Sequence, residues 1–570
     1  MRGEEKLTRK NDTGTQTQRD VDAVSIQSED VGHEGVKTVQ ATHRVFGRYS
    51  KWALFVSLGL AAYIYSLDGT TTYAYLAFAV SSFGRHSFIS TIQSPSGKPV
   101  IAKIADVRSR GFAYVFVLIF YVVGYIVIAS AKNAESIAGG IIVGYTGLQL
   151  LTQIIIADIT TLKWRALVSA SMSLPFVINA FVGSNINARR RRVALGYGMF
   201  AILVPAALAP LIGRSRRGYI VKSVPKERTV TQRLVSTAQK LDVVGLALLG
   251  TSVALILLPM TLARSAEGGW RNPSMIAMEV VGIVLLPVYF LYSAYLAKVP
   301  VVPKRFLRNR SVVLACLVGA FDFISFYISY TYLYSFVLIV KPWPLIHATY
   351  FAQTQTVALT VFAIVAGVIA RFTRRYKAIL IAGLAIRLLG AGDAEVVWSQ
   401  LLQGIGGGFA AVMAQTGAQA SVKHADTAMV TAVVLLVTEI GGSIGSAIAG
   451  SIWTSLMPDK LEQYLPFVDA ETRAQLFGSL YVVAAEPRGT YDDVMKVLCI
   501  AATAFAVPPL LMAFFMPDWY LGEGQNAVEG LGLDGHRVEG AFTHSYVLSL
   551  PLLPGLELRD LLSTRQGGGN

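Results

Sequence analysis

Four acidic residues stand within or beside long apolar stretches of the sequence, where charged side chains are rare. They are Asp68, Glu279, Asp322 and Glu439. A charged side chain at the centre of a bilayer costs about 2.5–3.5 kcal/mol on insertion scales, so it usually faces a cavity, pairs with a cation or exchanges protons. Desolvation raises the pKa of a carboxyl group and a nearby cation lowers it, so a carboxylate that meets two environments in turn can load and release a proton. The pattern predicts proton exchange.

Position along the chain sets the order of preference among these residues. Asp68 and Asp322 come first because tyrosines concentrate in the same two stretches, and Glu439 comes third. Glu279 comes last because it lies in a pair of segments outside the two main halves described below. For each residue, the alternative is a carboxylate held structurally by Arg387 or by a helix N-terminus.

Tyrosines crowd the two stretches that contain Asp68 and Asp322. A tyrosine can present an apolar ring to a ligand while its hydroxyl forms a hydrogen bond. As a set they predict the lining of a cavity, although any single one could instead pack between helices or lie at a membrane interface. The set is Tyr65, Tyr73, Tyr75, Tyr327, Tyr330, Tyr332 and Tyr334.

Other reactive side chains do not form a recognisable catalytic or metal-binding pattern. The two cysteines, Cys316 and Cys499, lie in apolar stretches and are expected to be small buried hydrophobes, and no metal site or cofactor is predicted. No nucleophile, base and orienting group occur at a usable spacing, so an enzyme is not expected. The glycines at 404–408 and 441–450 lie inside apolar stretches and predict close helix packing, not a phosphate loop.

The elements that must position these residues are long apolar segments. Stretches of roughly 15 to 28 residues recur from Trp52 onward, and an α-helix needs about 20 to cross the hydrocarbon. Lipid leaves backbone amides without partners, and the period-two alternation of a barrel is absent, so the predicted fold class is an all-α, polytopic membrane protein with fourteen helices. The segments are 52–67, 86–105, 112–131, 137–157, 166–186, 194–212, 243–263, 274–297, 312–340, 349–370, 378–392, 396–419, 428–455 and 494–516.

Composition supports the same class. Of the 570 residues, 53% are hydrophobic and only 15% are charged, against about 25% charged in globular proteins, so much of the surface must face lipid. The net charge of +15 comes from short basic clusters between the segments, which orient helices. Nucleic acid is therefore not an expected partner, and membrane lipid is.

Basic residues also predict orientation and domain division. The N-terminal flank and the connections after even-numbered segments carry roughly twice as many Lys and Arg as the other connections, which places both termini in the cytoplasm. We expect a disordered tail, a six-helix half, a basic linker, an extra helix pair, a second six-helix half with an outer loop at 457–493, and a cytoplasmic tail. Their ranges are 1–50, 51–212, 213–242, 243–297, 298–520 and 521–570.

The loop between the second and third segments resembles a motif of the major facilitator superfamily. Residues Ala102 to Arg110 align with the pattern Gly-x-Leu-Ala-Asp-Arg-x-Gly-Arg, with Asp106 and Arg110 at its acidic position and its last basic position and with Ala102 and Ser109 in place of its two glycines. Opposite charges across a short turn can latch one helix to its neighbour in one conformation and release it in another. The alternative is an ordinary solvated loop.

Several longer stretches resemble the fungal siderophore-iron transporters of that superfamily, and the resemblance covers about residues 45 to 530. It implies two six-helix halves with alternating access, and uptake of ferric siderophores with protons. The siderophore would bind the iron, so the carrier needs no metal ligands, and Gln353 joins the tyrosines as a substrate-binding residue. The stretches include Tyr63–Tyr73, Lys98–Asp106, Asp322–Tyr327, Tyr350–Thr356, Gln403–Gly408 and Ile440–Gly445.

The resemblance also gives the outer loop a role. In this family an extracellular loop before the last segment distinguishes siderophore transporters from related drug exporters. Here the loop is amphipathic, and its aromatic residues are expected to help capture the substrate; a purely structural cap is the alternative. These residues are Tyr464, Phe467, Phe477 and Tyr481.

Two alternative functions stay open. A proton-driven drug exporter would have the same fold and the same periodicity. A non-transporting chain, either a decayed paralogue or the product of an imperfect gene model, is favoured by a second segment interrupted at 95–99, by a short eleventh segment that contains Arg387, and by the run Arg189 to Arg192 on the predicted outside. The expected location is the plasma membrane, with endosomal vesicles as the alternative.

Overall fold

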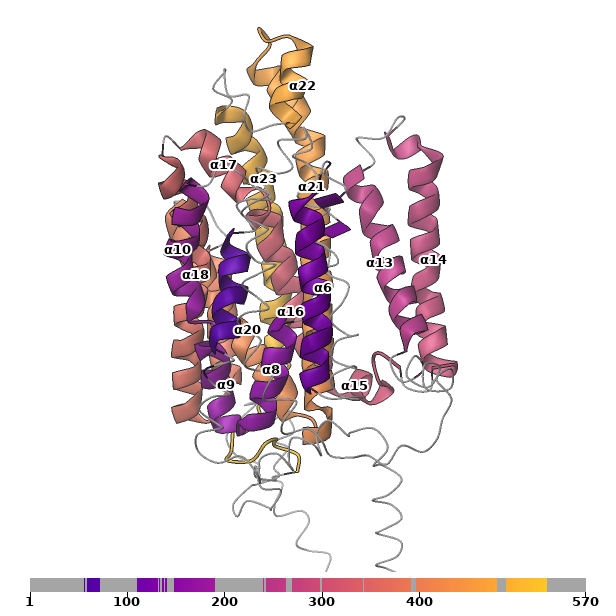
Figure 1. Ribbon diagram of the computed structural model, residues 1–570, viewed down its shortest axis with the longest axis vertical. Helices are drawn as coiled ribbons and strands as arrows, with labels where there is room; N and C mark the ends of the chain where they lie inside the picture. The colour runs from indigo at the N-terminus through magenta and orange to yellow at the C-terminus, as the bar shows by residue number, and fades with distance from the viewer. Residues whose placement is uncertain are drawn as a thin grey trace, which may run out of the picture.

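The computed structural model describes most of the predicted segments and the connections around the second half. The described ranges are 59–71, 110–131, 148–189, 242–262, 269–297, 300–390 without Pro342, 396–478 and 488–529, with a few single positions. Predicted features outside them are the second and sixth segments, the N-terminal tail, nearly all of the basic linker, and Tyr73, Asp106 and Tyr481. Regular structure in the described ranges is helical (Figure 1).

The first half contributes a helix at 59–71 and the helices α6 (Arg110–Ala129), α8 (Leu148–Ile159), α9 (Leu162–Ser171) and α10 (Pro175–Arg189). The predicted fifth segment is divided between α9 and α10 by a turn at Met172–Leu174. Pro175 begins α10 because proline lacks the N–H that a continuous helix needs but suits the first helical position.

The extra pair consists of α13 (Val243–Leu262) and α14 (Pro273–Tyr295), which stand beside the main bundle in Figure 1. A Cβ at Gly282 would come within 2.9 Å of Ile256, so the two helices approach closely at this glycine. Asp242 directly precedes α13 and joins it to α14 and to the chain that follows α14. It accepts hydrogen bonds from Tyr292 Oη and from the Val301 amide, each at 3.0 Å.

The second half begins with the short α15 (Lys304–Arg308) and continues through α16 (Arg310–Tyr330), α17 (Leu333–Val340), α18 (Leu345–Thr373), α19 (Lys377–Gly390), α20 (Val396–Ala420), α21 (Thr427–Tyr464), α22 (Ala470–Gly478) and α23 (Arg488–Phe514). The predicted ninth segment is divided at Thr331–Tyr332 into α16 and α17. Helix α21 continues past the predicted end at 455 to Tyr464, so part of the expected outer loop is helical.

Small residues allow the second half to pack tightly, as their clusters predicted. A Cβ at Gly441 would lie 2.3 Å from the carbonyl oxygen of Ala320, and one at Gly408 would lie 2.4 Å from that of Leu359. Backbones therefore approach closely between α16 and α21 and between α18 and α20.

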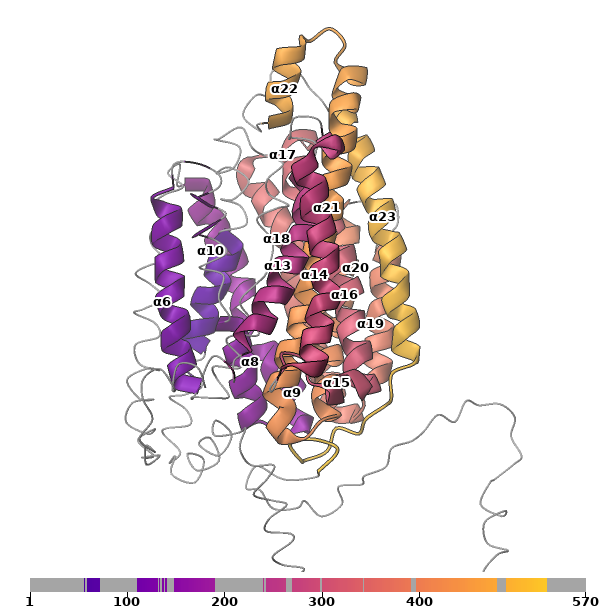
Figure 2. The same cartoon turned by 90° about the vertical axis from the view of Figure 1, so that its right-hand side faces the viewer.

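Seven helical spans in the described ranges, two of them formed by the consecutive helices α9–α10 and α16–α17, are long and apolar enough to cross a membrane. Their outer surfaces expose large apolar side chains, such as Ile283 on α14 and Val361 on α18, as lipid contact requires. Figure 2 shows α6, α8 and α10 on one side and the helices of the second half on the other. We call the end at which α15 lies the lower end and the end at which α22 lies the upper end (Figure 1).

Candidate functional site

A cavity of about 160 Å³, lined by both apolar and polar side chains, lies between the two halves, toward the lower end. The first half lines it with Gln149 and Gln153 of α8, and the second half with Gln415 and Gln419 of α20. Each glutamine pair is spaced four residues apart, so both members lie on one face of their helix. Serine and threonine hydroxyls complete the polar lining, which comprises Ser169, Ser173, Thr416 and Thr438. The cavity therefore offers neutral hydrogen-bonding groups to a ligand within a mainly apolar lining.

Asp322 lies in the wall of this cavity and is paired with Arg387 of α19. Arg387 Nε is 2.8 Å from Asp322 Oδ1, and Arg387 Nη2 donates a hydrogen bond of 3.2 Å to the Asp322 carbonyl oxygen. The Nε–H does not point at the carboxylate, so that contact is an ion pair without a hydrogen bond. Both residues are buried, and Gly407 leaves the space that the guanidinium group fills. Arg387 was the structural partner that the sequence offered as an alternative to proton exchange.

Asp68 occupies a different environment, inside the first half. It accepts a hydrogen bond of 2.7 Å from Tyr121 Oη and a second one from Tyr125 Oη. The two rings stack with centroids 4.5 Å apart on α6. Sequence reasoning missed both tyrosines; their spacing of four residues in an apolar helix places them on one face but does not reveal which helix that face meets.

Glu439 and two predicted tyrosines lie near one another and come from both halves. Tyr327 of α16 is within electrostatic range of Glu439 on α21 and of Tyr65 from the first half. Tyr65 Oη in turn donates a hydrogen bond of 3.3 Å to Gln149 Oε1. Gln149 lines the cavity, whereas Tyr65, Tyr327 and Glu439 are not among its lining residues.

Tyr332 and Tyr334 are packed inside the second half. Tyr332 is fully buried and stacks on Trp453, with ring centroids 4.1 Å apart and an interplanar angle of 9°. Tyr334 is also buried, and its hydroxyl lies 3.2 Å from Thr349 Oγ1. Both tyrosines pack between helices here, and their contact with a substrate stays a prediction.

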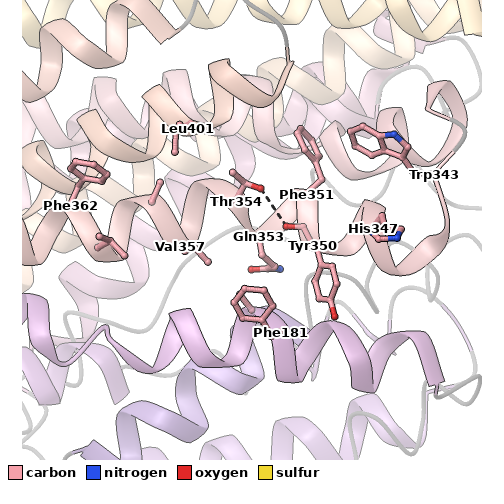
Figure 3. A pocket seen from close by; sticks show the side chains of 13 residues that line it. Phe181, Trp343, His347, Tyr350, Phe351, Gln353, Thr354, Val357, Phe362 and Leu401 are labelled. Carbon is pink, nitrogen blue, oxygen red and sulfur yellow. Dashed lines mark hydrogen bonds between the residues drawn. The ribbon is translucent and has the colours of Figure 1, made fainter.

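A second and larger pocket, of about 640 Å³, lies where α10 meets α18 (Figure 3). Gln353, predicted to bind substrate, lines it together with Tyr350, His347 and Trp343. Asn185 of α10 donates a hydrogen bond of 3.0 Å to Tyr350 Oη, so this tyrosine also joins the two halves. Sequence reasoning missed the role of Tyr350, although the residue opens the stretch that carried the resemblance.

The outer aromatic residues occupy the upper end. Phe467 is 79% exposed beyond the end of α21, whereas Phe477 of α22 packs against the buried core. Tyr464 is half-exposed, and its hydroxyl donates a hydrogen bond of 3.0 Å to Asp493 Oδ2, which Lys460 Nζ also contacts at 2.8 Å. Tyr481 lies outside the described residues.

The expected latch falls mostly outside the described part of the chain. Arg110 begins α6, and Asp106 lies in the preceding range that the structure does not describe. The latch stays a prediction.

Comparison with characterised proteins supplies the family. The chain is 33% identical to the low affinity heme transporter str3 of Schizosaccharomyces pombe, with 87% of each chain covered. It is 34% identical to the siderophore transporter fer7 of Mycosarcoma maydis, covering 92% of this chain and 89% of that protein. It is 33% identical to the siderophore iron transporter mirC of Emericella nidulans, covering 88% and 90%. No family sequence model matches the chain.

A solved structure supports the fold. A bacterial homologue of the human lysosomal transporter Spinster aligns over 83% of this chain and 97% of its own, with 14% identity and a TM-score of 0.50. The predicted all-α major facilitator fold is thus confirmed, while the number of fourteen helices depends partly on segments outside the described residues. With a third of its residues shared with these carriers over nearly its whole length, the chain belongs to the siderophore-iron transporter family of the major facilitator superfamily.

Proposed function

We propose that this protein carries ferric siderophores into the cell by proton symport, through alternating access between its two halves. The observation that carries the proposal is the cavity between the two halves, to which each half contributes glutamine amides and whose wall contains Asp322, the buried partner of Arg387. A siderophore is a large polar chelator that already surrounds its iron. Neutral amides and hydroxyls suit such a ligand, and the iron needs no ligand from the protein.

The size of the cavity supports movement of the halves. Ligand sites for drug-sized molecules enclose about 300–1,000 Å³, and a ferric siderophore is at least as large. A cavity of about 160 Å³ must therefore widen before it can accept the substrate. Because its two walls belong to different halves, separation of the halves at one end would provide the space and the entry path.

Proton coupling is assigned first to Asp322 and Asp68, then to Glu439. Protonation of Asp322 would remove its attraction to Arg387 and free the guanidinium group to bind an acidic part of the substrate, so proton binding and substrate binding would favour one another. Asp68 is held by tyrosine hydroxyls, which donate to a carboxylate, and its protonation would weaken that contact. Glu439 borders the tyrosine cluster.

The remaining assignments follow from orientation. The lower end carries clustered basic residues, including Lys304, Arg308 and Arg374, and would face the cytoplasm. The upper end, with exposed Phe467, would face outward and take part in capture of the substrate.

We keep the predicted division into two six-helix halves, a basic linker and an extra helix pair. We place the carrier at the plasma membrane, with endosomal vesicles as the alternative, and assign it no enzymatic activity.

Uptake in cells that lack other siderophore carriers tests the proposal. Cells expressing this protein should accumulate radiolabelled iron supplied as a ferric siderophore, and cells expressing Asp322→Asn should bind the chelate but fail to concentrate it. Heme should be offered in parallel, because one relative is a heme transporter. Drug resistance without uptake of iron would favour the exporter.

A further inference from the structure

A segment after the last helix lies across the lower ends of both halves. Residues 515–529, which we call the C-terminal strap, leave α23 and continue below α9 as the yellow trace in Figures 1 and 2. The sequence placed 521 onward in a cytoplasmic tail, but residues 521–529 make specific contacts with the bundle.

In the first half, the strap completes the N-terminus of α9. The first amides of a helix have no partner within it, and the N-cap residue Thr161 makes no side-chain cap hydrogen bond here. The Leu162 amide donates to Gly524 O at 2.9 Å and the Lys163 amide to Gly522 O at 3.1 Å. Backbone carbonyls of the strap thus substitute for a cap.

Charged side chains of the first half also hold the strap. Arg165 is almost completely buried, and its Nη2 donates a hydrogen bond of 2.8 Å to Gln525 O. Lys163 Nζ lies 2.6 Å from Glu523 Oε1. The same carboxylate oxygen is 3.2 Å from Nη2 of Arg374, which belongs to the second half. Glu523 therefore joins one cation from each half.

Attachment to the second half is more extensive. Leu521 pairs with Arg374 through a backbone hydrogen bond of 2.9 Å, and the Ala527 amide donates to Ala420 O at 3.1 Å. Trp519 Nε1 donates a hydrogen bond of 2.8 Å to Ser311 Oγ. Ala420 is the last residue of α20 and directly follows Gln419, which lines the cavity.

The contacts with the two halves alternate along the strap, and the chain between neighbouring contacts is short. Leu521 holds the second half, Gly522 and Gly524 hold the first, and Ala527 again holds the second. Consecutive Cα atoms are about 3.8 Å apart, so one or two residues cannot span a gap that opens by many ångströms. If the lower ends separate, one set of contacts must break.

We infer that the C-terminal strap is a detachable tie that holds the lower ends of the two halves together, and that it releases from α9 each time the carrier opens to the cytoplasm. Release occurs at α9 because the strap is continuous with α23 and has its wider attachment on the second half. Detachment returns the first amides of α9 and the Arg165 guanidinium group to water, which can hydrate both. The inference depends on the proposed alternating access but not on the identity of the substrate.

Reversible crosslinking tests whether release is required. In a background with Cys316→Ala and Cys499→Ala, the pair Lys163→Cys/Glu523→Cys ties the strap to the first half through a short, reducible bifunctional thiol reagent. The matched control, Arg374→Cys/Glu523→Cys, ties the same strap position to the second half. The first crosslink should abolish uptake, which a reductant restores, and the control crosslink should leave the uptake of its own variant unchanged. Normal uptake through the first crosslink would overturn the inference.

Labelling from the cytoplasmic side tests the same point without any substrate. A single cysteine at Gln415→Cys, in the same background, reports access to the cavity in inside-out membrane vesicles. Charge reversal by Glu523→Lys should raise its rate of labelling by a membrane-impermeant maleimide several-fold. The control Asp518→Lys reverses a strap charge whose ion pair, with Arg375 at 2.8 Å, lies within the second half, and it should not change the rate. Equal rates in both variants would contradict a gating tie even if no siderophore is transported.

Discussion

At the residue scale, Asp322 of the cavity wall forms a buried ion pair with Arg387. Removing one partner of a buried pair leaves an uncompensated charge and costs about 3–5 kcal/mol. Arg387→Gln alone should therefore lower the free energy of unfolding by about that amount, and Asp322→Asn/Arg387→Gln should recover most of it while uphill uptake stays absent. Thermal unfolding in detergent, followed with a thiol-reactive dye that detects buried Cys316, provides the measurement. Equal loss of stability in the single and double variants would show that the two charges do not act as a pair.

The tyrosine hydroxyls that hold Asp68 are a second test at this scale. Hydrogen bonds to charged groups contribute about 1.5–3 kcal/mol and neutral ones about 0.5–1.5 kcal/mol. Tyr121→Phe should therefore destabilise the protein more than Tyr114→Phe, whose hydroxyl is 3.3 Å from Thr152 Oγ1 and meets no carboxylate in that contact. The same dye-based unfolding measurement compares them. A larger loss from Tyr114→Phe would contradict the account of Asp68.

At the element scale, the contact between α9 and α18 joins the lower ends of the two halves through a glycine. A Cβ at Gly367 would come within 2.6 Å of Leu167 Cα, whereas one at Gly250 of α13 meets no atom within 4 Å. Overpacking typically costs about 1–3 kcal/mol, so Gly367→Ala should destabilise the protein and slow transport. Gly250→Ala should be neutral or stabilising by up to about 1 kcal/mol, since alanine is the better helix former. Unfolding and uptake of the two variants, measured together, check this prediction.

Sequence patterns predicted the helices better than their interruptions and partners. The length of the apolar stretches predicted the membrane-spanning helices, because lipid leaves the backbone no alternative to a helix. The divisions near Pro175 and at Thr331 were missed because both stretches, despite their serines, threonine and proline, are apolar enough on average to resemble single segments. Asp322 and Arg387 could be proposed as a pair because charges in a membrane must be compensated. Tyr121 and Tyr125 could not be assigned to Asp68, since the contact depends on which helix faces α6.

At the scale of the whole molecule, the contacts of Glu523 with both halves should weaken in acid. Hydrogen bonding from Lys163, with the added charge of Arg374, lowers the pKa of Glu523 below its usual 4.5. A lowered pKa contributes stability that is fully present above the usual value and is lost as the pH falls through the lowered one. The difference in melting temperature between the wild type and Glu523→Gln should be constant from about pH 7 to about pH 6 and shrink below about pH 4.5. A difference that grows on acidification would refute this account.

Transport by the purified protein tests the central claim most directly. Proteoliposomes that contain the full chain would receive a ferric siderophore labelled on the metal, with and without an imposed gradient that is acidic on the side of α22. The account predicts accumulation above the external concentration only with the gradient, at a rate that falls when Asp322→Asn replaces the wild type. Equal accumulation of the chelate with and without the proton gradient, or export of the chelate driven by that gradient, would contradict proton-coupled uptake.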